Sequence, residues 1–407
     1  MILPKIRNEI SAALVAPAFR SKMKHSKKIL VVMPSWLGDA VMAQVLLKIL
    51  KFNNEQQKIS VQIDVLAVAW VAKILARMPE ISEIIENPFE HGNFKFFERK
   101  KFAKNIIKTK SYDEVYVLPN SWKSALIPYF AEIPKRFGFV GELRYGLLNF
   151  REKLNKKRFP LMIERFARLA FLENPENNFA DLTAFFPKLT IDKNNTTKLL
   201  NLLGIKSQES EIIVFCPGAE YGKAKRWLPE HFAELSNLLS NYYYKNNTSK
   251  VLKIVILGSN KDNTIGEKIV ALANNANLLN LCGKTDLTDV IDLLANAEII
   301  ISNDSGLMHV AAAVGVQQIA IYGSSSPNFT PPLSANNLAE IVTLKLPCSP
   351  CFQRNCPKNK HSSEYLQCLK DITPQMIFEK ILQKITKKIN KKINKKYKFP
   401  REVAKNF

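Results

Sequence analysis

Residues 28–51 read KILVVMPSWLGDAVMAQVLLKILK, in which two apolar stretches are separated by a short polar turn. The first stretch, 28–33, predicts a buried β-strand, and the second, 40–51, predicts a helix. Gly38 and Asp39 lie between them. In this position the aspartate is either the cap of the helix or a carboxylate that faces a ligand cleft and accepts a proton.

The bulk composition indicates a globular protein of two or three domains. The chain has 407 residues, of which 46% are hydrophobic, and no apolar run approaches the roughly 18–20 residues of a membrane-spanning helix. The net charge is +23. Residues 1–28 carry seven Lys/Arg and one Glu, and residues 380–407 carry eleven Lys/Arg and one Glu. Because the excess positive charge lies at the two ends, a nucleic-acid groove is disfavoured and an anionic partner is expected at the ends.

Strand and helix patterns alternate along the chain. Further strands are predicted at 60–70 and 112–120, and a second series of strands begins near residue 211, with strands at 211–219, 251–259, 277–283, 298–304 and 317–323. This alternation predicts an α/β protein of two facing doubly wound Rossmann-like domains with a cleft at the carboxyl ends of both sheets. The predicted division is a basic extension (1–27), an N-terminal domain (28–195), a C-terminal domain (205–370), a last helix (371–388) and a basic tail (389–407), with a polar connector KNNTTK at 193–198.

The segment ISNDSGLMHVAAAVG (301–315) joins a strand to a helix of small residues. Ser305 is placed to cap this helix, and Gly306 lets a ligand approach the backbone. Free N–H groups at a helix start favour an anion such as a diphosphate. The alternative is a capped helix without a ligand. The candidate donor-binding residues in this segment are Asp304, Ser305, Gly306, Leu307 and His309.

Two other loops follow predicted strands of the C-terminal domain. In CPGAEYGKAKRWLPEHF (216–232), Lys223 and Lys225 are suited to neutralise a leaving diphosphate, although a solvated basic loop explains them equally well. In LGSNKD (257–262), Asp262 is either a ribose contact or a helix N-cap.

The third strand of the N-terminal domain is followed by LPNSWKSALIPYF and IPKRFGFVGELRYGLLN. Here Lys123, Arg136 and Arg144 alternate with aromatic residues, a composition that suits an anionic sugar acceptor. Single basic residues of this kind are also common on solvated surfaces.

Two features near the C-terminus remain open on sequence alone. Four cysteines, Cys348, Cys351, Cys356 and Cys368, allow either a tetrahedral zinc site or free thiols and a local disulfide, and their spacing matches no common zinc ribbon. In the lysine-rich tail, Ile385, Ile389, Ile393 and Tyr397 recur every four residues. This pattern predicts either a helix that contacts an anionic membrane surface or a solvated tail.

Taken together, the motifs WLGDAVM, LPNSWKSALIPYF, GELRYGLLN, CPGAEYGKAKRW, NDSGLMHVAAA and YGSSSPNFTPPLS resemble the bacterial ADP-heptose:lipopolysaccharide heptosyltransferases, glycosyltransferases of GT-B fold. The resemblance covers about residues 27–385, and the second and third of these motifs favour subtype II over subtype I. Two departures are the leucine in KRWLP, at Leu228, and the cysteine cluster, which only some relatives share.

The resemblance implies an inverting, metal-independent transfer of heptose from ADP-heptose to the first heptose of the inner core, heptosyl-Kdo2-lipid A. It implies that Asp39 is the general base, that Lys225 contacts the diphosphate together with Ser305, Gly306 and His309, and that Asp262 contacts the ribose. An enzyme of this kind would work in the cytoplasm as a peripheral protein on the inner membrane. The alternatives are subtype I or III with another core acceptor, and a non-catalytic basic protein that binds glycolipid.

Overall fold

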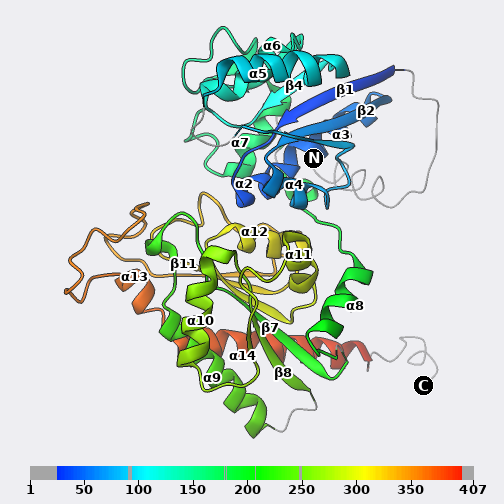
Figure 1. Ribbon diagram of the computed structural model, residues 1–407. Helices are drawn as coiled ribbons and strands as arrows, with labels where there is room; N and C mark the ends of the chain where they lie inside the picture. Colours follow the sequence, from blue (N-terminus) through cyan, green and yellow to red (C-terminus); the bar gives the residue numbers. More distant parts are fainter. Residues whose placement is uncertain are drawn as a thin grey trace, which may run out of the picture.

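The computed structural model describes residues 25–89, 94–177, 179, 181–206, 208–246 and 250–396, with only the backbone of 387–396. Two domains, drawn one above the other in Figure 1, each enclose one parallel six-stranded sheet with helices on both faces. This is the predicted α/β architecture of two doubly wound domains.

The N-terminal sheet has the strand order β3-β2-β1-β4-β5-β6. Its strands are β1 (His25–Val32), β2 (Ile59–Ala67), β3 (Glu83–Glu86), β4 (Glu114–Val117), β5 (Lys135–Phe139) and β6 (Phe150–Glu152). Its α-helices are α2 (Leu37–Met42), α3 (Gln44–Gln56), α4 (Ala69–Leu75), α5 (Phe96–Phe102), α6 (Leu126–Phe130) and α7 (Met162–Arg168). Ile29, Leu30 and Val31 are completely buried, because helices cover both faces of the sheet, and this explains the continuous apolar run of the first strand.

The C-terminal sheet has the order β12-β11-β10-β7-β8-β9. Its strands are β7 (Ser210–Cys216), β8 (Val251–Ile256), β9 (Leu278–Asn280), β10 (Ile299–Asn303), β11 (Gln318–Tyr322) and β12 (Ala339–Thr343). The helices are α9 (Pro229–Lys245), α10 (Asn263–Leu272), α11 (Leu287–Ala295), α12 (Gly306–Val314), α13 (Gln367–Lys370) and α14 (Pro374–Lys396), and α8 (Lys193–Leu202) links the two domains.

In each sheet the strand order reverses once. The chain passes outward from β1 through β2 and β3 and then returns to β4, on the other side of β1. In the second domain it passes from β7 through β8 and β9 and returns to β10. Ligands of doubly wound folds bind at such reversal points, at the carboxyl ends of the strands. The loops after β1, β4, β7 and β10 are therefore the places to look for a site.

Several predicted boundaries are wrong. The helix after the first strand begins at Leu37 rather than at residue 40, so Gly38 and Asp39 lie inside its first turn. The second strand ends at Ala67, level with the end of β1, and α4 begins at Ala69. The polar segment 193–198 is helical because the Asp192 carboxylate caps α8, accepting hydrogen bonds from the backbone N–H groups of Asn194 and Asn195.

The C-terminal helix is also longer than predicted. It continues to Lys396, so the first part of the predicted basic tail is helical, since no proline or glycine interrupts residues 375–396. Ile385 of the predicted membrane-contacting stripe packs against the core of the C-terminal domain. The side chains of Ile389, Ile393 and Tyr397, and the N-terminal extension up to residue 24, lie outside the described residues. Within the described residues, no helix is long and apolar enough to cross a membrane.

Candidate active site

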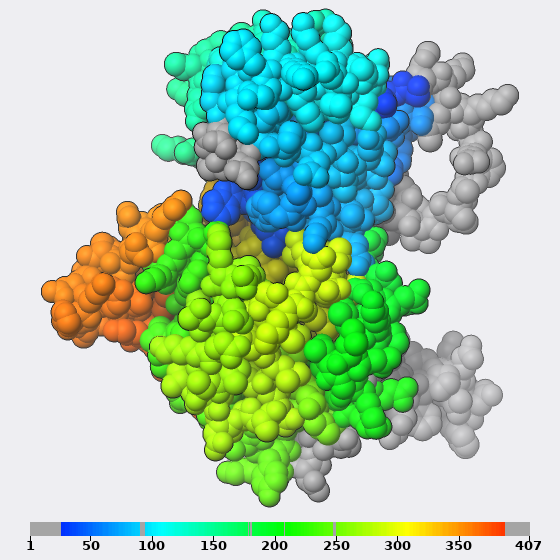
Figure 2. Space-filling view, in the orientation of Figure 1, coloured from blue at the N-terminus to red at the C-terminus, as the bar shows by residue number. Residues whose placement is uncertain are grey.

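The two domains meet through α2, which follows β1, and α12, which follows β10. Figure 2 shows the blue surface of the N-terminal domain resting on the yellow and green surface of the C-terminal domain. Two glycines allow the close approach. A Cβ atom on Gly38 would lie 2.7 Å from Cδ2 of His309, and a Cβ atom on Gly306 would lie 2.8 Å from the Cβ atom of Leu37. Both predicted glycines therefore lie where the reversal points of the two sheets come together.

Asp39 lies in the first turn of α2, but it does not cap the helix. The N-cap residue is Trp36, and no side chain makes a capping hydrogen bond there. Burial raises the pKa of the Asp39 carboxyl to about 6; the charge of Lys225 opposes this shift and that of Asp304 adds to it. A carboxyl group with a pKa in this range is ionised at neutral pH and is basic enough to accept a proton.

Lys225 and Asp304 form an ion pair next to Asp39. The Nζ atom of Lys225 lies 2.5 Å from Oδ2 of Asp304, and the two side chains are 17% and 5% exposed. Lys225 ends the short 3₁₀ turn η6 (Lys223–Lys225) after β7, and Asp304 directly follows β10. Loops from the two neighbouring central strands thus deliver one cation and one anion to the same point. Lys223 lies in the same turn with its side chain exposed.

The start of α12 supplies neutral hydrogen-bond donors. His309 is buried, and this burial lowers its pKa to about 4, so the imidazole is neutral at pH 7. Ser305 occupies the N-cap position, but contrary to the prediction its side chain makes no capping hydrogen bond. Leu307, in the first turn of α12, packs its side chain against the hydrophobic core. The first N–H groups of a helix are not used within the helix and attract an anion.

Two contacts that the sequence did not reveal hold the Lys225 turn. The backbone N–H of Ala224 donates to the carbonyl oxygen of Arg354 at 3.0 Å, and the Tyr221 hydroxyl donates to the carbonyl oxygen of Phe352 at 2.7 Å. The Tyr221 ring is 5.0 Å from Nζ of Lys225 and 5.3 Å from the Arg354 guanidinium. The loop that contains the cysteines therefore positions the turn, a role that no local pattern in 348–368 signals.

The four clustered cysteines line a cavity of about 20 Å³ beside Ala224 and Ser324. All four are free thiols. Among the described residues, no group of three or more His, Cys, Asp or Glu side chains is arranged to hold a metal ion.

Asp262 ends the short 3₁₀ turn η7 (Asn260–Asp262), which follows β8, and its carboxylate is hydrogen-bonded within its own loop. It accepts hydrogen bonds from the backbone N–H and the hydroxyl of Ser259 at 2.9 and 2.7 Å. A Cβ atom on Gly218 would lie 2.6 Å from this carboxylate, so Asp262 also reaches the loop after β7. Asp262 therefore takes part in the capping box that begins at Ser259, and its contact with a ribose stays a prediction.

The three candidate acceptor residues have different environments. Arg144 is completely buried and donates to the carbonyl oxygens of Pro119 and Phe139, so the prediction that it contacts an acceptor is wrong. Arg136 donates to the carbonyl oxygens of Leu147 and Ile133, so its guanidinium is held by the segments that flank β5. Lys123, after β4, is half-buried, and among the described residues no hydrogen bond or ion pair of its ammonium group is found.

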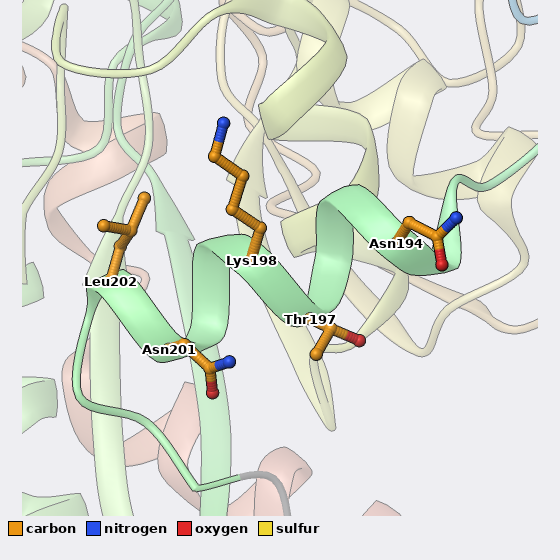
Figure 3. Close-up of a pocket in the computed structure, with 5 residues that line it drawn as sticks. All are labelled: Asn194, Thr197, Lys198, Asn201 and Leu202. Carbon is orange, nitrogen blue, oxygen red and sulfur yellow. The ribbon is translucent and has the colours of Figure 1, made fainter.

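A wide, open hollow of about 620 Å³ lies elsewhere, on α8 (Figure 3). Its five lining residues all come from this one helix. It lies along the linker helix and contains none of the candidate residues, so it is not the site.

A domain pair of this kind, with a carboxylate opposite a cation and a helix start, defines a nucleotide-sugar glycosyltransferase of GT-B type. The sequence model of glycosyltransferase family 9 (heptosyltransferase) matches residues 99–362, and the chain belongs to this family. Lipopolysaccharide heptosyltransferase 2 of Salmonella typhimurium is 41% identical over 359 residues, which are 87% of this chain and 97% of the relative. Lipooligosaccharide heptosyltransferase 2 of Haemophilus influenzae is 40% identical over 367 residues, with 87% and 98% covered.

The fold agrees with these relatives. The structure of E. coli ADP-heptose lipopolysaccharide heptosyltransferase II superposes with a TM-score of 0.74 at 38% identity, covering 89% of this chain and 99% of that one. A family 9 glycosyltransferase from Veillonella parvula shares the fold, with a TM-score of 0.65 at 20% identity. The predicted GT-B architecture and the predicted family are therefore confirmed.

Proposed function

We propose that this glycosyltransferase moves L-glycero-D-manno-heptose from ADP-heptose to the first heptose of the lipopolysaccharide inner core, with inversion at the transferred carbon. The single observation that carries the proposal is the Asp39 carboxylate, with its raised pKa, beside the Lys225–Asp304 pair and the start of α12. The identity to heptosyltransferases of subtype 2 over most of the chain supports the choice of donor and acceptor.

In this mechanism Asp39 takes the proton from the attacking acceptor hydroxyl. The oxygen forms the new bond to the anomeric carbon while the bond from that carbon to the diphosphate breaks and ADP takes the electron pair. A base on one domain and an anion site on the other suit an in-line displacement, because the entering and leaving groups lie on opposite faces of the sugar. Contact between the domains would also exclude water, which would otherwise hydrolyse the donor.

The C-terminal domain would stabilise the departing ADP. Lys225 supplies positive charge, the first N–H groups of α12 supply a fixed dipole, and neutral His309 supplies a further hydrogen-bond donor. Lys223 and Asp262 lie on neighbouring loops, where they would contact the phosphates and the ribose. We propose that these groups act without a metal ion.

On the N-terminal domain, Lys123 is the remaining candidate among the three basic residues for contact with the anionic acceptor. Because this acceptor is a glycolipid, we propose that the enzyme works as a peripheral protein on the cytoplasmic face of the inner membrane.

The decisive experiment measures ADP release from ADP-heptose, with and without heptosyl-Kdo2-lipid A, for the wild type and for Asp39→Asn. Acceptor-dependent release that falls by about 100-fold or more in the variant is the expected result. Equal release by both proteins would remove Asp39 from the mechanism. An acceptor series of different core lengths separates the subtypes, and no release with any acceptor would overturn the proposed reaction.

A further inference from the structure

Exposed aromatic rings lie on and beside α5 and α6 of the N-terminal domain. The side chain of Phe97 is 80% exposed, that of Phe94 is 51% exposed and that of Tyr129 is 43% exposed. Figure 1 shows α5 and α6 side by side on the N-terminal domain. Aromatic side chains contribute strongly to stability when they are buried in a core. A group of solvent-exposed aromatic side chains therefore indicates a binding surface.

These rings form one connected surface rather than scattered contacts. The Phe94 ring centroid lies 5.9 Å from that of Phe96 and 5.9 Å from that of Trp122. The chain of contacts continues from Phe96 to Phe97 at 5.5 Å and, in the other direction, through Phe130 to Tyr129. The half-buried members pack against the core beneath, which anchors the exposed ones.

Exposed lysines accompany the rings. Four exposed lysines, Lys95, Lys100, Lys101 and Lys104, lie on or beside α5, and Glu98 is the one acidic residue between positions 94 and 104. The Nζ atom of Lys100 lies 5.9 Å from the centroid of the Phe130 ring. We call the exposed rings Phe94, Phe97 and Tyr129, together with these four lysines, the α5 patch. The patch combines exposed aromatic rings with exposed lysines.

The α5 patch reaches the edge of the domain at which the acceptor would arrive. Trp122, which contacts Phe94, follows the carboxyl end of β4, and β4 pairs with β1. Asp39 lies just beyond the carboxyl end of β1. Trp122 and the base candidate therefore follow adjacent strands at the same edge of the sheet, and Lys123 directly follows Trp122 in the chain.

We propose that the α5 patch docks this protein on the surface of an anionic lipid bilayer, which rests on the proposed function because that function places the acceptor in a membrane. Exposed phenylalanine and tyrosine side chains enter the boundary between headgroups and acyl chains, and lysines bind anionic headgroups. The exposed lysines complement the charge of an anionic bilayer. Docking there would hold the α2 edge close to the membrane surface, where a lipid-anchored sugar projects.

The test measures binding of the full chain to sedimented phosphatidylcholine vesicles with and without 30% phosphatidylglycerol. Phe97→Ser is expected to weaken binding about tenfold, since one large apolar side chain no longer enters the bilayer. The pair Lys100→Glu/Lys101→Glu is expected to weaken binding to the anionic vesicles by a similar factor or more. Phe97→Trp should restore binding and show quenching of its fluorescence by brominated lipids.

Matched controls come from the other domain and the linker. Tyr244 on α9 is 88% exposed, and Lys193 and Lys198 on α8 are exposed as well. Tyr244→Ser and Lys193→Glu/Lys198→Glu should leave vesicle binding within about twofold. If the patch variants bind as well as these controls, the proposal is wrong and the basic chain ends carry membrane binding.

A second measurement separates this proposal from the proposed function. With a deacylated, water-soluble acceptor, Phe97→Ser should release ADP at the wild-type rate, whereas with the same acceptor embedded in vesicles it should be about tenfold slower. An equal loss with both acceptors would make the patch part of the sugar site and overturn the docking role. If even the wild type releases no ADP with either acceptor, the proposed function fails, and the vesicle data still decide whether the patch binds membranes.

Discussion

Two buried ion pairs in this protein have similar exposure but very different surroundings. Arg77 and Asp292, which join the N-terminal domain to α11, are 13% and 0% exposed, whereas Lys225 and Asp304 in the candidate site are 17% and 5% exposed. The Asp292 carboxylate accepts two hydrogen bonds from Arg77, one from Asn195 and one from the backbone N–H of Asp192.

The Asp304 carboxylate has fewer partners. Within the described residues its one recorded donor is Lys225, and Asp39 lies close enough to be affected by the charge of both. A carboxylate with four donors is satisfied and rigid, whereas one with a single donor can give up that donor to a substrate. We propose from this difference that the Arg77 pair stabilises the domain arrangement and that the Lys225 pair serves the reaction.

The largest expected effect comes from removing the cation of the site pair. Lys225→Met should lower acceptor-dependent ADP release by about 100-fold to 1000-fold, because a cation that stabilises the leaving diphosphate is lost. A steady-state assay of ADP release measures this. Lys245→Met, an exposed lysine at the end of α9, should stay within about twofold of the wild type. A loss below tenfold in Lys225→Met would contradict the distinction between the two pairs.

For the ion pair Arg77–Asp292, between the domains, we expect a loss of stability and little loss of activity. Arg77→Met leaves the Asp292 charge buried without its main partner and should lower the free energy of unfolding by about 3 kcal/mol. Urea denaturation measures this value, and turnover per folded molecule should change by less than about twofold. The pair Lys73–Asp286 is a natural control, because both side chains are about half exposed, and Lys73→Met should cost less than about 1 kcal/mol.

Sequence patterns predicted β1, β2 and β4 of the first sheet and β7 to β11 of the second, because well-buried strands read as uninterrupted apolar runs. They did not predict the partly exposed strands β3, β5, β6 and β12. The approach of Asp39 to Lys225 and His309 was implied only by the family resemblance, since these residues come from different domains and their local patterns equally suit caps and solvated loops. The burial of Arg144 could not be predicted, because its carbonyl acceptors at Pro119 and Phe139 are set by tertiary structure and leave no pattern in the sequence.

A smaller effect concerns the free energy of unfolding, which the buried Asp39 carboxylate lowers when it is ionised. Its pKa in the folded protein, about 6, exceeds the ordinary value of 3.8, so the folded state disfavours the ionised form. The cost is absent below pH 3.8, grows between pH 3.8 and 6, and is complete above pH 6. Asp39→Asn should therefore raise the free energy of unfolding at pH 7 by about 2 kcal/mol, somewhat less than the full shift because the side chain keeps some contact with solvent.

Urea denaturation at pH 7 and at pH 3.5 tests this prediction, and the advantage of Asp39→Asn should disappear at the lower pH. In the wild type, kcat/KM should also fall about tenfold per pH unit below pH 6, since the free enzyme must hold Asp39 ionised. If Asp39→Asn gains no stability at pH 7, Asp39 is not held in a desolvated position. The contrast between the candidate site and the well-paired carboxylate of Asp292 would then be weaker than proposed.

The smallest expected effect is that of metal removal. It tests whether Lys225 is the cation that holds the diphosphate or whether a metal ion shares this role. If Lys225 and the start of α12 hold the diphosphate, incubation of the purified protein with EDTA should change ADP release by less than about twofold, and added Mg²⁺ should not raise it. A large loss that Mg²⁺ or Zn²⁺ restores would mean that a metal shares the diphosphate. Lys225→Met would then retain substantial metal-dependent activity. The Lys225–Asp304 pair would no longer differ from the Arg77–Asp292 pair in its importance for the reaction.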